Sequence, residues 1–189
     1  MMKLCYGPGA CSFVPHVGIE AIKAATGEEI ETQSVKLHKG EQHTSEYLAL
    51  NPMGQVPLLV VDGKPLNQIL AICDYLDRRF PQAGLLPSDG WQRAQAMSLF
   101  AWMNNTVHPT FTHIFRTAKF AASEAAQADV KNTAVATFRE CLERIQTLAQ
   151  QVGPFLLGDR LFLKACRRLW AGINPELEMG RFLTEVSPY

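Results

Sequence analysis

The sequence has no surplus of charge of either sign and no long apolar run. Its 18 lysine and arginine residues balance 18 aspartate and glutamate residues, which leaves no basic field to attract a nucleic-acid backbone. No apolar stretch approaches the roughly 20 residues that span a bilayer, and residues 1–11 lack the features of a signal peptide. We therefore expect a cytoplasmic protein that has neither nucleic acid nor a membrane as its partner.

The cysteine pattern also excludes two classes of protein. There are 5 cysteines, an odd number at wide and irregular spacings, and none of them forms a CxxC pair. Disulfide frameworks use even numbers of cysteines, and structural zinc sites use closely spaced pairs. We expect reduced thiols and no metal site. The cysteines are Cys5, Cys11, Cys73, Cys141 and Cys166.

The first 80 residues alternate between strand and helix signals. Residues 3–6 are β-prone and end in the turn Gly7-Pro8-Gly9, after which we expect a helix with Ser12 as its N-cap. The apolar stripe expected on that helix comprises Val14, Val17, Ala21, Ile22 and Ala25. The further expected elements are a strand over 29–37, a helix over 45–50, strands over 56–61 and 64–66 around Asp62-Gly63, and a helix capped by Asn67. This order is a thioredoxin-like layout and predicts an α/β domain.

A segment rich in proline and glycine at residues 81–90 interrupts the pattern, and no convincing strand follows it. Helical periodicity predicts helices over 91–118, 132–152, 161–171 and 175–186. The predicted organisation is therefore an N-terminal domain over 1–80, a linker over 81–90 and an all-helical domain over 91–189.

Four stretches resemble the cytosolic glutathione S-transferase family, especially its bacterial beta class. They are Gly7-Pro-Gly-Ala-Cys-Ser12, Asn51-Pro-Met-Gly-Gln-Val-Pro57, Leu66-Asn-Gln-Ile-Leu-Ala-Ile72 and Trp102-Met-Asn-Asn-Thr-Val-His108. The resemblance covers residues 1 to about 120 well and the last thirty residues poorly. It implies a glutathione-binding thioredoxin-like domain followed by a helical domain. It also implies a homodimer that detoxifies small hydrophobic electrophiles, with glutathione as co-substrate and no metal.

The resemblance implies three catalytic residues. Cys11 would lie beside the glutathione sulfur and be able to form a mixed disulfide with it, Ser12 would donate to the sulfur, and His108 would approach it from the second domain. Donors are needed because lowering a thiol pKa by two units takes about 2.7 kcal/mol, whereas a helix N-terminus supplies about 0.3–1 kcal/mol. On local sequence alone, a buried thiol at Cys11, a helix cap at Ser12 and an interhelical residue at His108 are the favoured interpretations, and the family stretches reverse this preference.

The resemblance also implies the glutathione-binding residues. Val56 and Pro57, joined by a cis bond, would expose backbone that pairs with the cysteinyl part of the peptide, next to Gln55. Gln68 would hold the γ-glutamyl end beside Ile69, which lacks the hydroxyl or amide of many relatives at a cost of about 0.5–1.5 kcal/mol. Lys39 would meet the glycyl carboxylate, or is an ordinary solvated lysine.

The segment after Gly158-Asp-Arg160 departs from the family pattern. Residues 161–168 lack the expected capping hydroxyl and aspartate, so we expect a shortened or rearranged second domain. Two functions other than glutathione transfer or reduction through Cys11 stay open. One is a non-catalytic, protein-binding member of the family, which Ile69 favours. The other is a glutaredoxin-like reductase, which the lack of a cysteine three residues after Cys11 disfavours.

Overall fold

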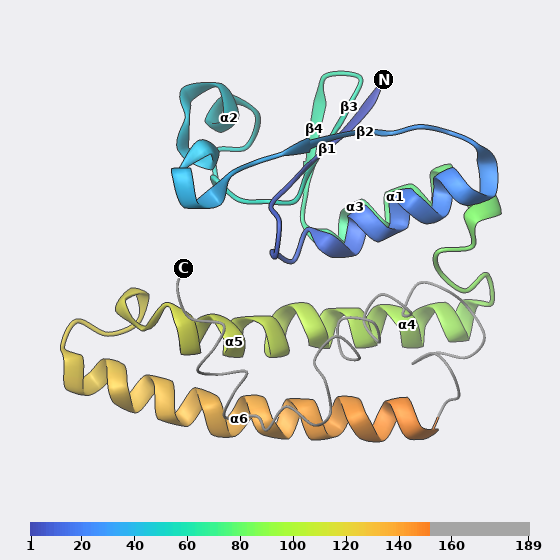
Figure 1. The fold of residues 1–189 in the computed structure, drawn as a ribbon. Coiled ribbons are helices and arrows are strands. Elements are labelled where there is room, and N and C mark those ends of the chain that lie inside the picture. The colour runs from blue at the N-terminus through green and yellow to red at the C-terminus, as the bar shows by residue number, and fades with distance from the viewer. Residues whose placement is uncertain (152–189) are drawn as a thin grey trace. The chain divides into compact units, whose positions relative to one another are not determined.

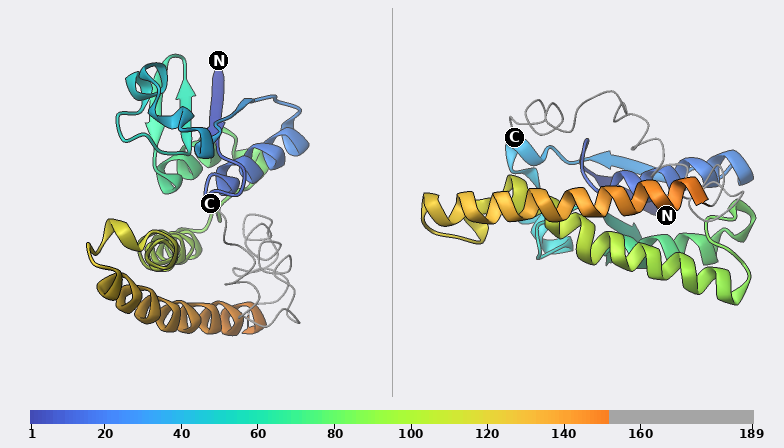
Figure 2. Two further views of the ribbon diagram at one scale, coloured as in Figure 1. Left: turned by 60° about the vertical axis from the view of Figure 1, so that its left-hand side comes forward. Right: turned by 90° about the horizontal axis from the view of Figure 1, so that it is seen from below.

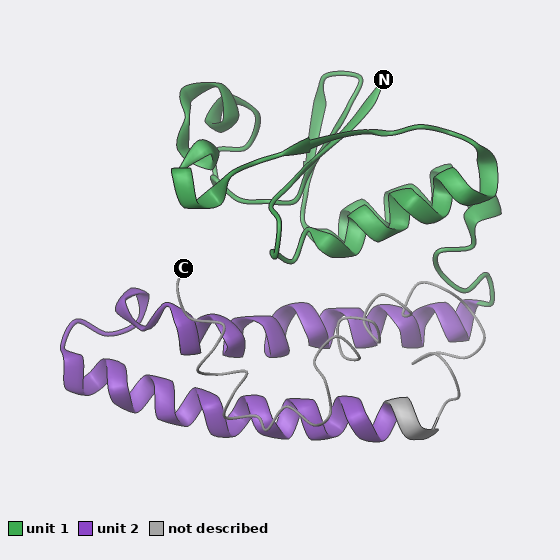
Figure 3. Ribbon diagram, viewed as in Figure 1, with its two compact units in different colours: residues 1–89, 160–166, 189 green, residues 90–159, 167–188 purple. Residues whose placement is uncertain are grey.

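The computed structural model describes residues 1–151, which fall into two compact units (Figure 3). Residues 1–89 form unit 1 and residues 90–151 belong to unit 2. The helices predicted over 161–171 and 175–186, and the predicted shortening of the second domain, lie outside the described residues.

Unit 1 is built on a four-stranded mixed sheet of order β2-β1-β3-β4 (Figure 1). The strands are β1 (Met2–Tyr6), β2 (Glu31–Ser34), β3 (Leu58–Val61) and β4 (Lys64–Asn67). β1 pairs with β2 in parallel, while the pairs β1–β3 and β3–β4 are antiparallel. The parallel pair needs a crossover, which α1 (Phe13–Thr26) supplies, and a tight turn joins the antiparallel β3 and β4. This is the thioredoxin-like domain predicted from the sequence.

α1 and α3 (Ile69–Arg79) lie side by side on one face of this sheet (Figures 1 and 2). The buried residues of α1 are Pro15, Gly18, Ile19, Ala21 and Ile22, and those of α3 are Ile72, Cys73, Leu76 and Asp77. The predicted stripe on α1 was therefore only partly correct, because Ala25 is exposed and Val14 is half-buried. α1 is apolar on more than one side, so periodicity alone did not identify the side that faces the sheet.

The remaining short elements of unit 1 occur in the connections. α2 (Ser45–Leu50) begins where predicted, and the Thr44 hydroxyl caps it by accepting the Tyr47 N–H at 3.3 Å. The prediction that Asn67 caps α3 was wrong, because Asn67 ends β4 and Gln68 precedes the helix. Three 3₁₀ turns complete the unit, namely η1 (Leu37–Lys39), η2 (Glu41–His43) and η3 (Pro81–Ala83).

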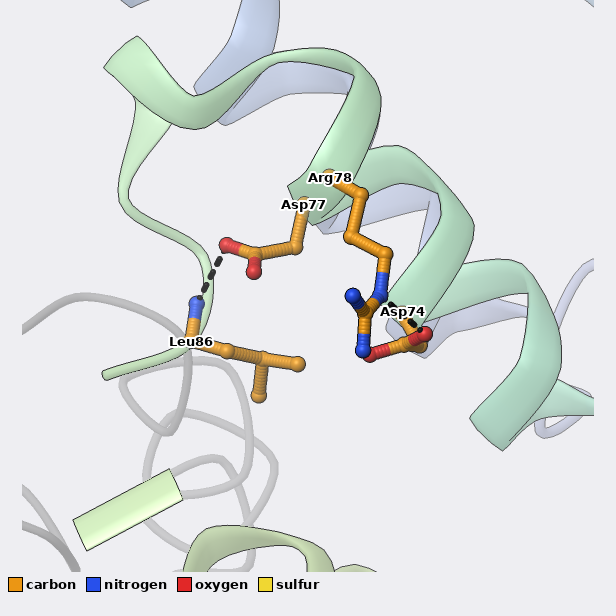
Figure 4. Close-up of polar contacts among 4 residues, drawn as sticks. All are labelled: Asp74, Asp77, Arg78 and Leu86. Atoms are coloured by element: carbon orange, nitrogen blue, oxygen red, sulfur yellow. Dashed lines mark hydrogen bonds and ion pairs between the residues drawn. The ribbon is translucent and has the colours of Figure 1, made fainter. Parts of the chain in front are cut away.

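The chain that follows α3 packs back onto unit 1. Leu85 and Leu86 are buried, and the Leu86 N–H donates to the buried carboxylate of Asp77 at 2.9 Å (Figure 4). Next to it, Arg78 pairs with Asp74 at 2.8 Å on the surface of α3. The proline- and glycine-containing segment is thus anchored to α3 up to Leu86.

Unit 2 is helical throughout its described part, which consists of α4 (Gly90–Trp102), a π-helical turn η4 (Met103–Val107), α5 (His108–Phe115), a 3₁₀ turn η5 (Thr117–Lys119) and α6 (Glu124–Gln151). The predicted continuous helix over 91–118 is therefore widened at η4. Pro109 explains the change, because its ring has no N–H to donate and collides with the carbonyl four residues earlier. α6 begins at Glu124, ahead of the predicted 132, and packs against α5, while its Cys141 and Ile145 form a buried cluster with Val107 of η4. None of the helices described in either unit is long and apolar enough to cross a membrane.

Gly18 offers a test of the packing between α1 and the segment after α3. A Cβ at this helical position would lie 3.6 Å from Leu85 Cδ1, an ordinary contact, and alanine is the better helix former. We expect Gly18→Ala to raise the free energy of unfolding by about 0.5–1 kcal/mol in urea titrations. Gly7→Ala is the contrasting variant and should destabilise, because its Cβ would meet Leu37 Cδ1 at 2.8 Å. A destabilised Gly18→Ala would contradict the described packing.

Candidate active site

The sheet register brings the predicted site segments of unit 1 to one edge. Cys5 lies opposite Leu58, and Leu58 lies opposite Asn67. The turn that follows β1, the Val56-Pro57 segment that precedes β3, and Gln68 after β4 therefore emerge at the same end of the three strands. β2 runs parallel to β1, so the chain toward Lys39 leaves from this end as well.

The hydroxyl of Ser12 holds the turn after β1. Its oxygen accepts the Gly7 N–H at 3.0 Å and donates to the Gly7 carbonyl at 3.1 Å, and the side chain is fully buried. Ser12 precedes α1 at the N-cap position, but its side chain makes no capping bond, which corrects the expectation of a serine cap. The hydroxyl is already used within the turn, and its predicted role as donor to a sulfur stays a prediction.

Cys11 directly precedes Ser12 in this turn, and its side chain is half-exposed. Its Sγ lies 3.8 Å from the carbonyl oxygen of Val56, toward which the thiol donates. Burial raises the pKa of the Cys11 thiol, and the backbone N–H groups of Cys11 and Ser12 offset this only in part. Cys11 is consequently a neutral thiol, and hence a donor, near pH 7.

The Val56-Pro57 bond is cis, as predicted. The loop that leads to it is fixed by two side chains that both donate to the Gln55 carbonyl at 2.7 Å, the Tyr47 hydroxyl and the Asn51 amide. Val56 packs against the core cluster of Cys5, Val35, Tyr47 and Leu58. A Cβ on Gly7 would lie 3.3 Å from Val56 Cγ2, so the turn after β1 and the Val56 segment are in close contact.

Gln68 occupies an unusual backbone conformation, with φ 70° and ψ 122°. A residue with a side chain rarely adopts this region, and each such residue costs about 1–3 kcal/mol. Its carbonyl nevertheless accepts the Ile72 N–H at 3.0 Å and so begins α3. The Gln68 side chain is exposed, whereas Ile69 is half-buried.

Of the other predicted residues, Lys39 and Gln55 belong to unit 1 and His108 belongs to unit 2. Lys39 ends η1 and Gln55 precedes Val56, and the side chains of both are exposed. His108 begins α5 in unit 2, where desolvation lowers its pKa, so its imidazole is neutral near pH 7. The role predicted for His108 beside a sulfur of unit 1 stays a prediction. Within residues 1–151, no group of three or more histidine, cysteine, aspartate and glutamate side chains could hold a metal ion.

Comparison with known families identifies this arrangement. Residues 11–78 match the family model of the glutathione S-transferase N-terminal domain, and these residues include Cys11, the cis bond and Gln68. The chain carries a glutathione S-transferase N-terminal domain. The family resemblance inferred from the sequence is thereby confirmed.

The named relatives of this chain fall into two groups. It is 36% identical to the glutathione S-transferase GstA of Escherichia coli over 118 residues, which are 61% of this chain and 57% of GstA. It is 26% identical to the maleylacetoacetate isomerase of Dictyostelium discoideum over 189 residues, which are 97% of this chain and 81% of that protein. The chain thus spans little more than half of GstA but most of the isomerase.

Solved structures of transferases show the same fold. A glutathione transferase homolog from Sulfitobacter, solved with bound glutathione, superposes with a TM-score of 0.79 at 26% identity and covers 92% of this chain and 84% of its own. The beta class enzyme of Sphingomonas chungbukensis superposes with a TM-score of 0.73 at 24% identity, covering 95% of this chain and 87% of its own, a likeness of fold alone.

Sequence reasoning missed two residues of the candidate site. Tyr47 was assigned only to a helix, and Asn51 only to the stretch 51–57 that resembles the family. Burial, as the main cause, raises the pKa of Tyr47 to about 12. The family pattern over 51–57 marks Asn51, but neither this pattern nor the spacing of eight and four residues before Gln55 shows that both side chains bond to one carbonyl until the loop is folded.

The pKa of Cys11 predicts its reactivity. Because burial favours the neutral thiol, we expect the iodoacetamide rate at Cys11 to be low at pH 7 and to rise at a higher pH than for an exposed cysteine. Mass spectrometry of the Cys11 peptide measures its extent of alkylation at each pH and so gives the titration curve of the thiol. A Cys11→Ser variant identifies the alkylation of the other cysteines. If half-maximal reactivity occurred at a lower pH than in a free cysteine peptide, the pKa of Cys11 would not be raised.

The backbone of Gln68 predicts an effect on stability. Gln68→Gly removes the strain of the positive φ angle and should raise the free energy of unfolding by about 0.5–2 kcal/mol in urea titrations. Gln68→Ala is the matched control, because it removes the same carboxamide and keeps the strain. Equal stabilities of the two variants would show that residue 68 is not strained.

Proposed function

We propose that the chain is a glutathione transferase whose unit 1 binds glutathione by its backbone at Val56 and receives its sulfur beside Cys11. The observation that carries the proposal is the 3.8 Å contact between the Cys11 thiol and the Val56 carbonyl. A peptide whose cysteinyl backbone pairs with Val56 carries its own sulfur a few bonds from that pairing. The sulfur therefore reaches the neighbourhood of Cys11 without any rearrangement of the sheet.

The protonation state of Cys11 favours transfer over disulfide chemistry. A mixed disulfide requires the Cys11 thiolate, which burial disfavours, whereas stabilisation of a glutathione thiolate requires a donor, which a neutral thiol is. Free thiol is only about 3% ionised at pH 7. Complete ionisation gives at most about a 30-fold gain, and positioning supplies the rest of the acceleration. When bound, glutathione supplies the nucleophilic sulfur that attacks the electrophile.

The remaining residues of the proposal have narrower roles. The backbone at Gln68 and Ile69 meets the γ-glutamyl end, Lys39 meets the glycyl carboxylate, and Gln55 and Pro57 flank the pairing edge. His108 is proposed as a neutral imidazole that donates to the sulfur or moves a proton. Ser12 acts on the sulfur only if its proton leaves the Gly7 carbonyl, so its first role is to hold the turn. A small hydrophobic electrophile, a homodimer and a cytoplasmic location complete the proposal.

A glutathione-dependent isomerase is the second candidate, favoured by the isomerase relative matched over 97% of the chain. A thiolate that adds to a conjugated cis double bond leaves a single bond that can rotate, and loss of the thiolate then gives the trans product. The same backbone edge and the same donors serve this reaction, because both reactions begin with a stabilised thiolate. The electrophile alone separates the two candidates.

Glutathione titration by calorimetry tests the proposal. We expect binding at millimolar glutathione or below, together with turnover of either a chlorodinitrobenzene-type substrate or a maleyl compound, which decides between transferase and isomerase. Cys11→Ala should keep binding and lose about tenfold in turnover, the value of one hydrogen bond of about 1.4 kcal/mol. Ser12→Ala should instead lose about 1–3 kcal/mol of stability, because both polar groups of Gly7 lose a partner.

Several results would contradict this function. Lack of binding at millimolar glutathione would refute both enzymatic candidates and support a protein-binding member of the family. Rapid reduction of a mixed disulfide that depends on Cys11, without turnover of either electrophile, would support the reductase. A Ser12→Ala variant of unchanged stability and lost turnover would assign the hydroxyl to the sulfur.

A further inference from the structure

We propose that Tyr47 is a positioning residue for glutathione binding, which acts by fixing the direction of the Val56 N–H through the Gln55 carbonyl. The inference rests on the proposed function, because it assigns Val56 to the peptide-pairing edge. Tyr47 itself lies in α2 and has no role of its own in that function; its hydroxyl reaches the pairing edge through the Gln55 carbonyl.

Two buried donors meet on one oxygen. The Tyr47 hydroxyl and the Asn51 amide each donate to the Gln55 carbonyl at 2.7 Å, so both of its lone pairs are used. Asn51 is 1% exposed and Tyr47 is 8% exposed, so both donors are buried, and each bond to the exposed Gln55 is partly buried. Asn51 also accepts the N–H groups of Met53 at 3.3 Å and of Gly54 at 2.9 Å, so the same residue closes the loop.

The peptide plane transmits this constraint to the next residue. The Gln55–Val56 peptide is trans, so its N–H points opposite to its carbonyl oxygen in one rigid plane. Once the oxygen is held against Tyr47 and Asn51, the Val56 N–H must point away from them. Within residues 1–151 the structure gives this N–H no acceptor. It is thus a free, oriented donor, as an incoming extended peptide requires.

The contribution of the Tyr47 hydroxyl can be measured separately from that of its ring. The ring belongs to the core cluster with Cys5, Val35 and Leu58, whereas the hydroxyl reaches Gln55. The raised pKa of about 12 keeps the phenol protonated, and so a donor, over the whole range in which a transferase would work. Tyr47→Phe therefore removes the hydrogen bond, retains the packing and leaves Asn51 to satisfy the carbonyl.

The experiment compares wild type, Tyr47→Phe and the control Tyr75→Phe, which makes the same chemical change on the half-buried Tyr75 of α3. Calorimetry gives the Kd for glutathione, steady-state kinetics separates KM from kcat, and amide hydrogen exchange reports on the loop without any ligand. We expect Tyr47→Phe to raise the Kd and KM for glutathione about 3- to 10-fold, with kcat at saturating glutathione within twofold of wild type. Exchange of the Met53 and Gly54 amides should be faster in Tyr47→Phe and unchanged in Tyr75→Phe.

Each alternative outcome has a definite meaning. Unchanged Kd and unchanged exchange in Tyr47→Phe would overturn the inference, as would a loss of kcat and thermal stability at constant Kd, which is the signature of a merely structural tyrosine. Wild type that binds no glutathione refutes the proposed function. If Tyr47→Phe then still accelerates amide exchange at Met53 and Gly54, Tyr47 does fix the loop, and only the role of the loop in glutathione binding is refuted.

Discussion

The register between β1 and β3 is the constraint on which the candidate site depends. It places Cys5 opposite Leu58, and thereby puts the turn after β1 next to the residues that precede β3. Leu4, Leu58 and Leu59 are fully buried on these strands. Leu4 and Leu59 pair on one buried face of the sheet and Cys5 and Leu58 on the other, so a slip by one residue would exchange the side chains that fill these two faces and disrupt the packing of both. The apolar core, rather than any polar contact of the site, therefore decides that Cys11 meets Val56.

Within that frame, two effects compete at Cys11. The start of α1 offers backbone N–H groups that favour a thiolate, but burial favours the thiol, and burial is the larger cause. This order agrees with the modest value of a helix N-terminus, about 0.3–1 kcal/mol. A site in which the protein's own thiol stays neutral is suited to donating to a second sulfur. The same surroundings make Cys11 a poor nucleophile.

The sequence predicted the parts of the site that depend on local chemistry. Asp62-Gly63 defines a hairpin, and the spacing of Asn51, Gly54 and Pro57 matched a family pattern closely enough to predict the cis bond. It did not predict where hydroxyl groups point. Ser12 read as a cap because serine before a helix commonly caps it, whereas the fold directs the hydroxyl to Gly7, five residues back. The contact of Tyr47 with Gln55 was missed for the same reason, since it depends on a neighbour that folding supplies.

For the proposed function, the departure from the family pattern at Ile69 matters less than the sequence alone suggests. The sequence suggests a lost hydroxyl, but the groups that the structure presents at the sheet edge are mainly backbone: the Val56 N–H and carbonyl, and the amides after Gln68. A substitution at position 69 leaves those groups in place, whereas a change that lets their peptide planes rotate removes them. Strain at Gln68 and the two donors on Gln55 both act on such planes. If the proposed function holds, affinity for glutathione would therefore depend first on the residues that hold these peptide planes in place, and only second on the side chains that touch the ligand.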